Sequence, residues 1–306
     1  MRKSVFIILF FMICFFKLIQ SVSWACACGC GVFDVGTSSM FPSGQGGMVW
    51  EEYDFMDQDH NWSKSSSASA DDNSDKKIRT SFINTGFQYM FNRDWGVSVE
   101  LPYDLRQFKT LDDDGVSIDT FNHNAVGDMR IKGIYTGLSP DMSTGLEFGL
   151  KVPTRDWTYP NFDRDTEIGS GSTDALIGAY HRGFITDSVG YFIQNQLDQP
   201  FLTQGGYRPG TEDDAAAGVY YQGIQAGGVR VTPVAEVENS YRSRDRGWAA
   251  DPSDSGYERI LLTPGIEFDY KQMMVFFDVG FPVYQYMNGD QLVAKELWKV
   301  TVSYMF

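Results

Sequence analysis

Beyond its first residues, this sequence lacks any apolar run long enough to cross a bilayer as a helix, which takes about 20 residues. It also lacks a sustained 3.6-residue spacing of apolar positions, the pattern of an amphipathic helix. It has instead 31 glycines and 15% aromatic residues, with a negative mean hydropathy. These features exclude a helical membrane protein and favour an all-β protein with many tight turns.

Basic residues are also scarce, since 25 Lys and Arg face 40 Asp and Glu. Arg2 and Lys3 precede an apolar run from Val5 to Phe16, which predicts a secretory signal peptide over residues 1–25. Without that segment, which also contains Lys17, 22 basic residues remain and the net charge is −18. A chain this acidic is excluded as a binder of nucleic-acid phosphates.

Apolar and polar residues alternate strictly in many segments after residue 46. Val97, Val99 and Leu101, for example, interleave with Ser98 and Glu100. Period-two alternation places each set on one face of a β-strand. We predict twelve strands, each close to the length that a tilted transmembrane strand requires: 47–57, 79–91, 95–104, 124–136, 143–153, 172–181, 188–199, 216–226, 229–239, 258–268, 273–285 and 295–306.

The connections between these strands alternate in length. Outer-membrane barrels have long external loops and short periplasmic turns, so we expect a closed antiparallel barrel over residues 47–306 with both ends in the periplasm. A soluble sandwich or jelly roll is the alternative, but its loops do not usually alternate so regularly. The long connections are rich in acids, and we expect them to form a solvated surface that attracts cations.

The polar face of the strands predicts what lines the barrel interior. The signs of its charges are mixed, which leaves two interpretations: structural ion pairs that fill a narrow barrel, or a hydrated path that selects a solute. The expected interior charges are Glu100, Asp128, Arg130, Lys132, Glu147, Lys151, Arg230, Glu236, Glu238, Glu267 and Asp278.

The last strand has apolar or aromatic residues at every second position and ends in phenylalanine. Such a strand resembles the signal that the outer-membrane assembly machinery reads. Its outward set is Trp298, Val300, Val302, Tyr304 and Phe306, with Lys299, Thr301 and Ser303 on the opposite face.

Cys26, Cys28 and Cys30 follow the signal peptide in a segment, residues 26–46, that we expect in the periplasm. Three thiolates at alternate positions are suited to a soft metal ion such as Cu(I) or Zn(II). Disulfides or a tether to a periplasmic protein partner are equally open, because the compartment is oxidising and the number of thiols is odd. Acylation of Cys26 is a further alternative.

Only three histidines occur, His60, His123 and His181, and none stands beside a recognisable nucleophile motif. We therefore expect no enzyme. The remaining functions are a channel or transporter for a small solute and a non-conducting scaffold whose cysteine segment binds a soft metal or a partner protein.

Several short motifs occur in a consistent order between residues 120 and 306. They include Gly127–Lys132, Gly145–Thr154, Gly169–Asp174, Pro282–Gln285 and Asn288–Leu292. This series resembles a family of outer-membrane transporters named for the meta-pathway of phenol degradation. The resemblance implies an outer-membrane barrel that passes small, often aromatic, compounds, and it implies no catalytic residues. The cysteine triplet and the acidic loops depart from the family pattern.

Overall fold

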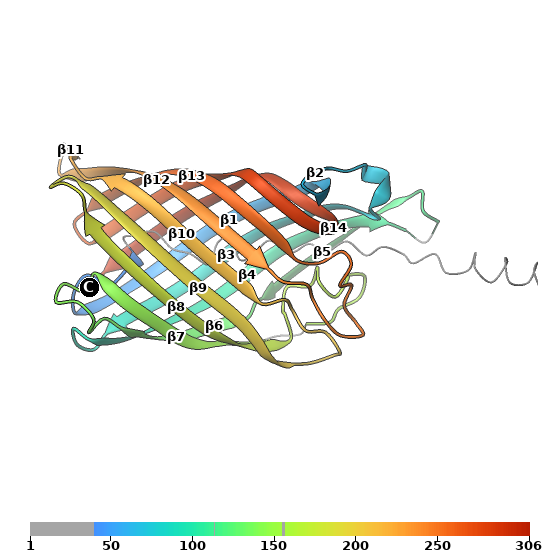
Figure 1. Cartoon of the computed structure of the whole chain (residues 1–306), viewed down its shortest axis with the longest axis horizontal. Coiled ribbons are helices and arrows are strands. Elements are labelled where there is room, and N and C mark those ends of the chain that lie inside the picture. The colour runs from blue at the N-terminus through green and yellow to red at the C-terminus, as the bar shows by residue number, and fades with distance from the viewer. Residues whose placement is uncertain (1–39, 113, 155–156) are drawn as a thin grey trace, which may run out of the picture.

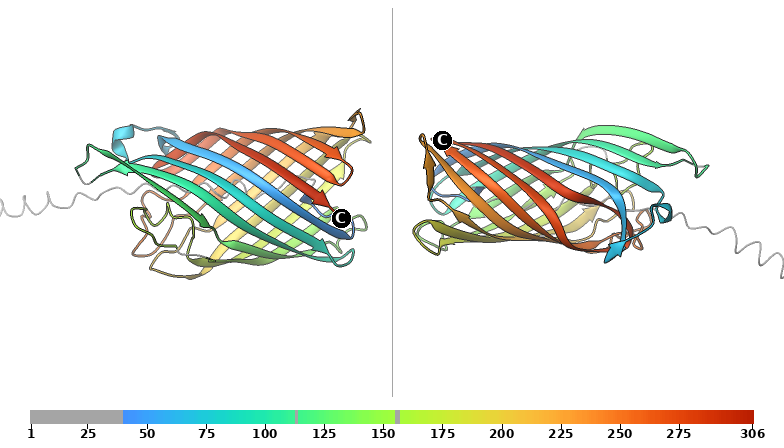
Figure 2. Two further views of the ribbon diagram at one scale, coloured as in Figure 1. Left: turned by 180° about the vertical axis from the view of Figure 1, so that it is seen from behind. Right: turned by 90° about the horizontal axis from the view of Figure 1, so that it is seen from above.

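The computed structural model describes residues 40–306 apart from 113 and 155–156, and it forms a closed barrel of tilted antiparallel strands (Figure 1, Figure 2). Eleven strands form the ring, and three more, together with the 3-10 turn η3 (Ala70–Asp72), lie outside it. The ring strands are β1 (Gly46–Lys64), β3 (Asp75–Met90), β4 (Trp95–Leu111), β6 (Met129–Tyr135), β7 (Thr144–Val152), β8 (Ser172–Phe184), β9 (Val189–Thr203), β10 (Glu212–Tyr221), β12 (Val229–Arg242), β13 (Tyr257–Tyr270) and β14 (Met273–Met305). The outer strands are β2 (Ser66–Ser67), β5 (Ile118–Val126) and β11 (Ile224–Ala226).

The ring closes where β1 pairs with the C-terminal part of β14. Beside this pairing, the Gly47 N–H donates to the Phe306 carbonyl at 2.8 Å, and the Phe306 N–H donates to the Gly47 carbonyl at 2.9 Å. Closure removes the two open edges that a flat sheet of the same strands would leave.

β14 accounts for the difference from the twelve strands that we predicted. Separate strands were expected at 273–285 and 295–306, but the structure has a single element of 33 residues. Its first part pairs with β13 and its second part with β1, both antiparallel, and the two parts meet near Gly289. Gly289 has φ +72°, a conformation that favours glycine. The predicted all-β closed antiparallel barrel is confirmed, whereas the count of twelve is not shown.

Other strand boundaries also differ from the prediction. The expected strand 124–136 is divided at Gly127–Asp128 into β5 and β6, and the expected strand 216–226 is divided into β10 and β11. Much of the expected loops 58–78 and 105–123 is strand, because β1 and β4 extend further and β4 pairs with β5. Polar side chains made these segments look like loops, but their backbones pair with neighbouring strands.

The connections separate by length between the two ends of the barrel. The short turns, such as 91–94, 185–188 and 271–272, lie at the end that also holds the C-terminus (Figure 1). The long connections 153–171 and 243–256 lie at the opposite end, together with β2 and β5. We call these ends the short-turn end and the long-loop end.

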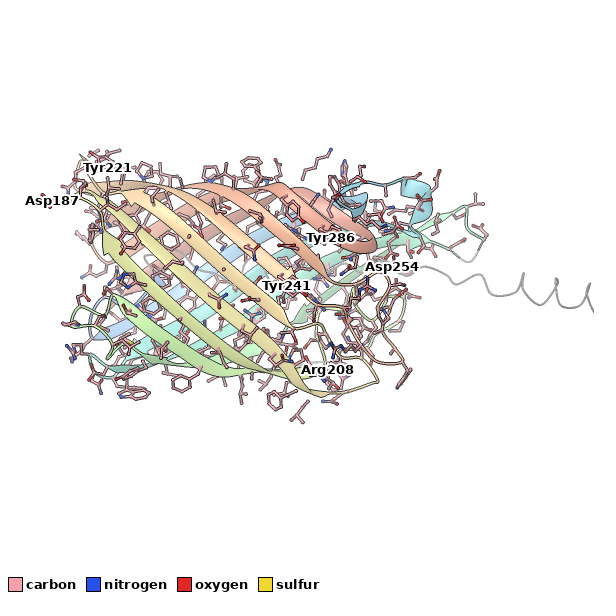
Figure 3. The ribbon with its side chains drawn as sticks, in the orientation of Figure 1. Asp187, Arg208, Tyr221, Tyr241, Asp254 and Tyr286 are labelled. Carbon is pink, nitrogen blue, oxygen red and sulfur yellow. The ribbon has the colours of Figure 1, made fainter. Side chains whose placement is uncertain are left out.

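The two faces of the wall differ as the alternation predicts. In the last part of β14, Lys299, Thr301 and Ser303 are buried inside, whereas Trp298, Val302 and Tyr304 are exposed on the outside. Many large apolar side chains are exposed in the same way around the barrel. Figure 3 shows exposed Tyr221 at the short-turn end, and Tyr241 and Tyr286 nearer the long-loop end. Within the described residues, no helix has both the length and the apolar character needed to span a membrane.

Candidate functional site

Among the described residues, two cavities inside the barrel share Glu100 in their walls, and a further hollow of about 280 Å³ lies at the short-turn end beside Phe41 and Phe306. The larger of the two cavities that share Glu100, about 150 Å³, lies towards the long-loop end, where residues 164–165, 167–170, 207 and 209–210 line it. The smaller, about 80 Å³, lies towards the short-turn end, where Met40 and Phe41 line it. The two cavities together mark a candidate path for a solute through the barrel.

Ion pairs occupy the wall that β6 to β9 form on one side of this path. Lys151 lies 2.6 Å from Asp174 and 2.9 Å from Asp198, each measured between Nζ and Oδ2. Lys132 Nζ lies 2.6 Å from Glu147 Oε2 and donates to Gln196 Oε1 at 3.2 Å. These lysines are desolvated, and paired carboxylates make their burial tolerable.

The opposite wall is richer in acids. Lys299 of β14 lies among buried carboxylates from β1, β12 and β14 that attract it electrostatically: Glu52, Asp54, Glu236, Glu238 and Asp278. The Thr301 hydroxyl donates to Glu52 Oε2 at 2.8 Å, and Asn84 Nδ2 donates to Asp54 Oδ2 at 2.9 Å. We had placed Lys299 on the inner face but had not counted it among the interior charges, although the alternation identifies it.

The expected interior charges fall into three places. Glu100, Asp128, Arg130 and Lys151 line the larger cavity, and Glu100, Lys132 and Glu147 line the smaller one. Glu236, Glu238, Glu267 and Asp278 are buried in the β12–β14 wall. Arg230 differs, because its side chain is 43% exposed and pairs with Asp269 at 3.0 Å. Arg230 is the second residue of β12 and lies next to a turn. At this end of the strand, its side chain is exposed at the rim of the barrel and does not reach the interior.

An aromatic cluster lies at the short-turn end of the path. Phe41, from the segment before β1, is buried against Tyr180, Phe192 and Phe276 of the barrel wall. Arg182 Nη2 donates to the carbonyl of Pro42 at 3.2 Å, which holds the same segment. Nothing in the sequence pattern had indicated that this segment enters the barrel.

The described part of the connection between β7 and β8 after residue 156, residues 157–171, covers the larger cavity, and we call it the lid. Arg106 of β4 donates from Nη1 to the carbonyls of Thr166 at 2.7 Å and Glu167 at 3.1 Å. The Ser170 N–H donates to Asp128 Oδ2 at 2.9 Å, and its hydroxyl donates to the same oxygen. The lid is therefore tied to the inner wall by charged hydrogen bonds.

Aromatic contacts hold the outer part of the lid against β4 and β5. The ring of Tyr159 stacks on His123 with centroids 3.7 Å apart, and Phe162 packs against Phe108 at 5.5 Å. β5, which pairs only with β4 among the described residues, thus serves as a support for the lid.

A second loop, residues 204–211, completes the closure. The Tyr207 hydroxyl donates to Asp245 Oδ2 at 2.6 Å, and the guanidinium of Arg164 lies over the Tyr207 ring at 4.4 Å. Arg242 Nη2 lies 3.0 Å from Asp245 Oδ1. The lid, this loop and the β12–β13 connection are thereby joined through Arg164, Tyr207 and Asp245.

Burial raises the pKa values of the acids in the lid. It raises the pKa of Asp163 to about 7, and it raises the pKa of Glu167 to about 7 although Arg164, 3.2 Å from Glu167, opposes the second shift. Burial, followed by the charges of Asp163 and Asp245, raises the pKa of Asp165 well above its ordinary value. A closed lid therefore favours protonated carboxyls.

These contacts correct one expectation about the loops. We had expected a solvated acidic surface, yet Glu167, Asp245 and Asp254 are buried. Each accepts hydrogen bonds from neighbouring loop groups, as Asp254 Oδ1 does from the Asp290 N–H at 2.8 Å. Folded loops supply partners for these acids, which composition alone does not reveal.

The metal prediction falls outside this description. Cys26, Cys28 and Cys30 lie outside the described residues, so the predicted soft-metal site stays a prediction. Within the described part of the chain, no group of three or more His, Cys, Asp or Glu side chains is arranged to hold a metal ion.

The three histidines lie apart. His60 Nδ1 contacts Asp59 at 2.5 Å, and His123 stacks on Tyr159 in the lid. His181 lies between the hydroxyls of Thr144, at 2.8 Å, and Tyr191, at 3.1 Å. The three histidines thus lie on different strands, each with contacts of its own.

Comparison with solved structures identifies a similar fold. An outer membrane channel from Pseudomonas putida F1 is 10% identical, with a TM-score of 0.67, over 89% of this chain and 100% of that chain. The β domain of the Bordetella autotransporter BrkA is 10% identical, with a TM-score of 0.48, over 86% of this chain and 100% of that one. The monoaromatic hydrocarbon channel CymD is 11% identical, with a TM-score of 0.46, over 94% and 98%.

No family model matches the sequence, and no curated protein does. At 10% identity, the similarity to the Pseudomonas channel concerns the fold alone. The expected barrel fold of an outer-membrane channel is therefore confirmed as a fold, and membership of the meta-pathway family stays a prediction.

Proposed function

We propose that this chain is a channel or transporter that passes a small solute across the bacterial outer membrane. The observation that carries this proposal is the pair of polar cavities inside a closed barrel whose outer face is apolar. Water-soluble barrels bury their apolar residues, whereas lipid favours an apolar exterior around a polar lumen. The fold shared with the Pseudomonas channel supports the same conclusion.

The aromatic residues support a position in the membrane. Tyr221 at one end and Tyr241 and Tyr286 towards the other lie where interfacial aromatic girdles flank an apolar band (Figure 3). Short turns are periplasmic in such barrels, so we place both ends of the barrel domain in the periplasm. Outer-membrane lipid would then contact the wall, and the assembly machinery would read the strand from Trp298 to Phe306.

Phe41 lies in the path at the short-turn end and the lid covers it at the long-loop end, and we infer that these two elements close the path. We propose that transport requires one or both closures to move. The segment before β1 is held by the stack of Phe41 on Tyr180 and by the hydrogen bond from Arg182, and the lid is held by hydrogen bonds and aromatic contacts. Each is a connecting segment outside the paired strands, so it can open without unfolding the wall.

Conductance across planar bilayers tests the proposal. Purified full-length protein is expected to give discrete current steps that bilayers treated with detergent alone do not give. A barrel that inserts but never conducts, at either polarity and with either closure weakened, would contradict the channel. That result would favour the alternative scaffold, in which Cys26, Cys28 and Cys30 engage a soft metal or a periplasmic protein. In neither case do we propose an enzymatic activity.

A further inference from the structure

Two arginines face each other at the long-loop end of the barrel, where the antiparallel pairing of β10 with β12 continues into the loops (Figure 3). Arg208 and Arg246 form a bridge in which the N–H of each donates to the carbonyl of the other, at 2.8 and 2.9 Å. In such a pair the Cα atoms are about 5.5 Å apart, and the two side chains lie on the same side of the sheet. Like charges in this arrangement repel each other.

Both side chains project away from the lumen. Tyr207 and Pro209 line the larger cavity, so Arg208, which stands between them, lies on the opposite side of the chain and is exposed. Asp245 is buried against the Tyr207 hydroxyl, and exposed Arg246 follows it. The two guanidinium groups therefore belong to the outer surface of the loops and not to the solute path.

The described part of the chain supplies no carboxylate partner to this pair. Neither Arg208 nor Arg246 forms an ion pair with a described residue, and the same holds for exposed Arg244. Arg208 donates to the Pro200 carbonyl at 2.7 Å, and Arg244 donates to Asn288 Oδ1 at 3.3 Å, so both acceptors are uncharged. An anion from outside the chain would relieve the repulsion between the arginines.

An exposed tryptophan accompanies the pair. Trp248 is 85% exposed, and its ring lies so close to Gly206 that a β-carbon at this glycine would overlap it. The Ala249 N–H donates to the Gly206 carbonyl at 3.2 Å, which fixes the loop that holds the tryptophan. Gly206 precedes Arg208 by two residues, and Trp248 follows Arg246 by two. An aromatic ring held in solvent beside arginines is suited to the boundary between lipid headgroups and water.

The order of side chains along the outer wall places these groups just beyond the apolar band. On β12, Val237 and Tyr241 are nearly half exposed, and Arg246 lies in the connection that follows. Phe201, 49% exposed near the end of β9, leads in the same way to Arg208. Five residues of tilted strand rise about 12 Å. Long arginine side chains can span much of that distance back to the headgroup layer.

We propose that Arg208, Arg244, Arg246 and Trp248 form a surface that binds the phosphate groups of a phosphorylated glycolipid in the outer leaflet. Arginine suits this role, because its planar guanidinium binds phosphate in a bidentate manner. The inference rests on the proposed function for its orientation, since only a barrel whose long-loop end lies outside the cell presents this surface to the outer leaflet.

Native mass spectrometry of the purified full-length protein in a non-ionic detergent measures the binding. The protein is titrated separately with diphosphoryl lipid A, with dephosphorylated lipid A and with sodium phosphate. We expect saturable binding of diphosphoryl lipid A that is at least about tenfold tighter than binding of the dephosphorylated form or of free phosphate.

Variants locate the surface. Arg208→Gln with Arg246→Gln removes both charges and should weaken binding of diphosphoryl lipid A about tenfold or more. Arg208→Lys with Arg246→Lys retains the charges without the bidentate geometry and should weaken it only about threefold, which separates loss of charge from loss of folding. Glu258→Gln removes an exposed acid of β13 and should not weaken binding. Arg93→Gln, an exposed arginine in a short turn at the opposite end, is the matched control and should bind as the wild type does.

Three results would overturn the proposal: equal binding of dephosphorylated lipid A, equal binding of sodium phosphate, which would indicate an adventitious ion only, or unchanged binding by the double glutamine variant. If the protein conducts simple salts yet fails to bind diphosphoryl lipid A, this inference fails and the channel stands. If it binds the glycolipid through these arginines but never conducts, the surface stands and the channel fails.

Discussion

Phe41 and Tyr180 stack face to face inside the barrel, with ring centroids 4.3 Å apart and ring planes within 3° of parallel. Tyr180 belongs to β8, whereas Phe41 precedes the first strand. The segment that leads into the barrel is thus part of the structure that blocks it.

Replacing Phe41 by alanine should open the short-turn end. The change removes the stack on Tyr180 and the contact with Phe192, worth about 0.5–1.5 kcal/mol beyond the buried area. We expect open probability in planar bilayers to rise about threefold to tenfold. Phe148→Ala, on the exposed outer face, is the control and should not change it. Equal currents for Phe41→Ala and wild type would contradict a blocking role.

The lid should open as the pH rises. Asp163 and Glu167 have pKa values of about 7 when buried in the closed lid, whereas exposed carboxyls titrate near about 4. The closed lid therefore binds more protons than the open lid between these values, and closure weakens as the pH increases from about 4 to about 7. We expect open probability to be at least about tenfold higher at pH 8 than at pH 5.

A double variant tests the origin of this pH dependence. Asp163→Asn with Glu167→Gln keeps these two groups neutral, so the part of the pH dependence that they contribute should be lost. Asp165, whose pKa burial also raises, is then the remaining acid of the lid that can titrate. Asp187→Asn is the control and should retain the wild-type profile. A double variant with the wild-type profile would show that the gating proton binds elsewhere.

Lys151 should stabilise the folded barrel, in addition to placing a positive charge in the lumen. Lys151→Met leaves Asp174 and Asp198 buried without their shared cation. We expect unfolding by urea in lipid vesicles, followed by tryptophan fluorescence, to show a loss of about 3–5 kcal/mol. Lys295→Met changes an exposed lysine and should cost less than about 0.5 kcal/mol. Similar values for the two variants would argue against a structural pair.

An arginine on the outer wall tests the position in the membrane. Val237 is 47% exposed near the middle of β12. In lipid, Val237→Arg should destabilise the folded barrel by about 2–4 kcal/mol, whereas Asp187→Arg at the rim should destabilise it by about 0–1 kcal/mol. Vesicle folding titrations measure both. If Val237→Arg were as well tolerated as Asp187→Arg, this face would not contact the hydrocarbon layer.

The cysteine triplet has a direct test. If Cys26, Cys28 and Cys30 hold a soft metal, protein purified under reducing conditions should contain about one equivalent of copper or zinc, and the triple serine variant should contain almost none. Elemental analysis of both proteins measures this. Negligible metal in both would leave disulfide formation or tethering to a partner protein.

The barrel was predictable because its signal is repeated along the whole chain. Alternation in each strand is a local pattern, and it identified the inner position of residues as distant as Glu100 and Asp278. The same pattern predicted an interior position for Arg230. This residue lies near the start of β12, and its side chain is exposed at the rim of the barrel. The cavities were not predictable, since their lining depends on which strands face each other across the barrel.

The closures of the path escaped prediction for a related reason. Phe41 packs its ring on Tyr180 and Phe192, which lie far along the chain, and its own neighbours in sequence show no strand or helix pattern. The lid was read as a solvated acidic loop, because the sequence does not show that Arg106 reaches its carbonyls or that Tyr159 stacks on His123. Long-range contacts of this kind produce no periodic pattern in the sequence.

The pairing of β1 with the last part of β14 has a consequence for biogenesis. Residues 48–64 form one side of the seam and residues 287–305 the other, so the cylinder cannot seal until everything between them has been synthesised. Until then, β1 has an unpaired edge that is open to pairing with another chain. If the chain is exported as proposed, a chaperone that shields the edge of β1 until the last strand arrives would therefore raise the yield of native protein.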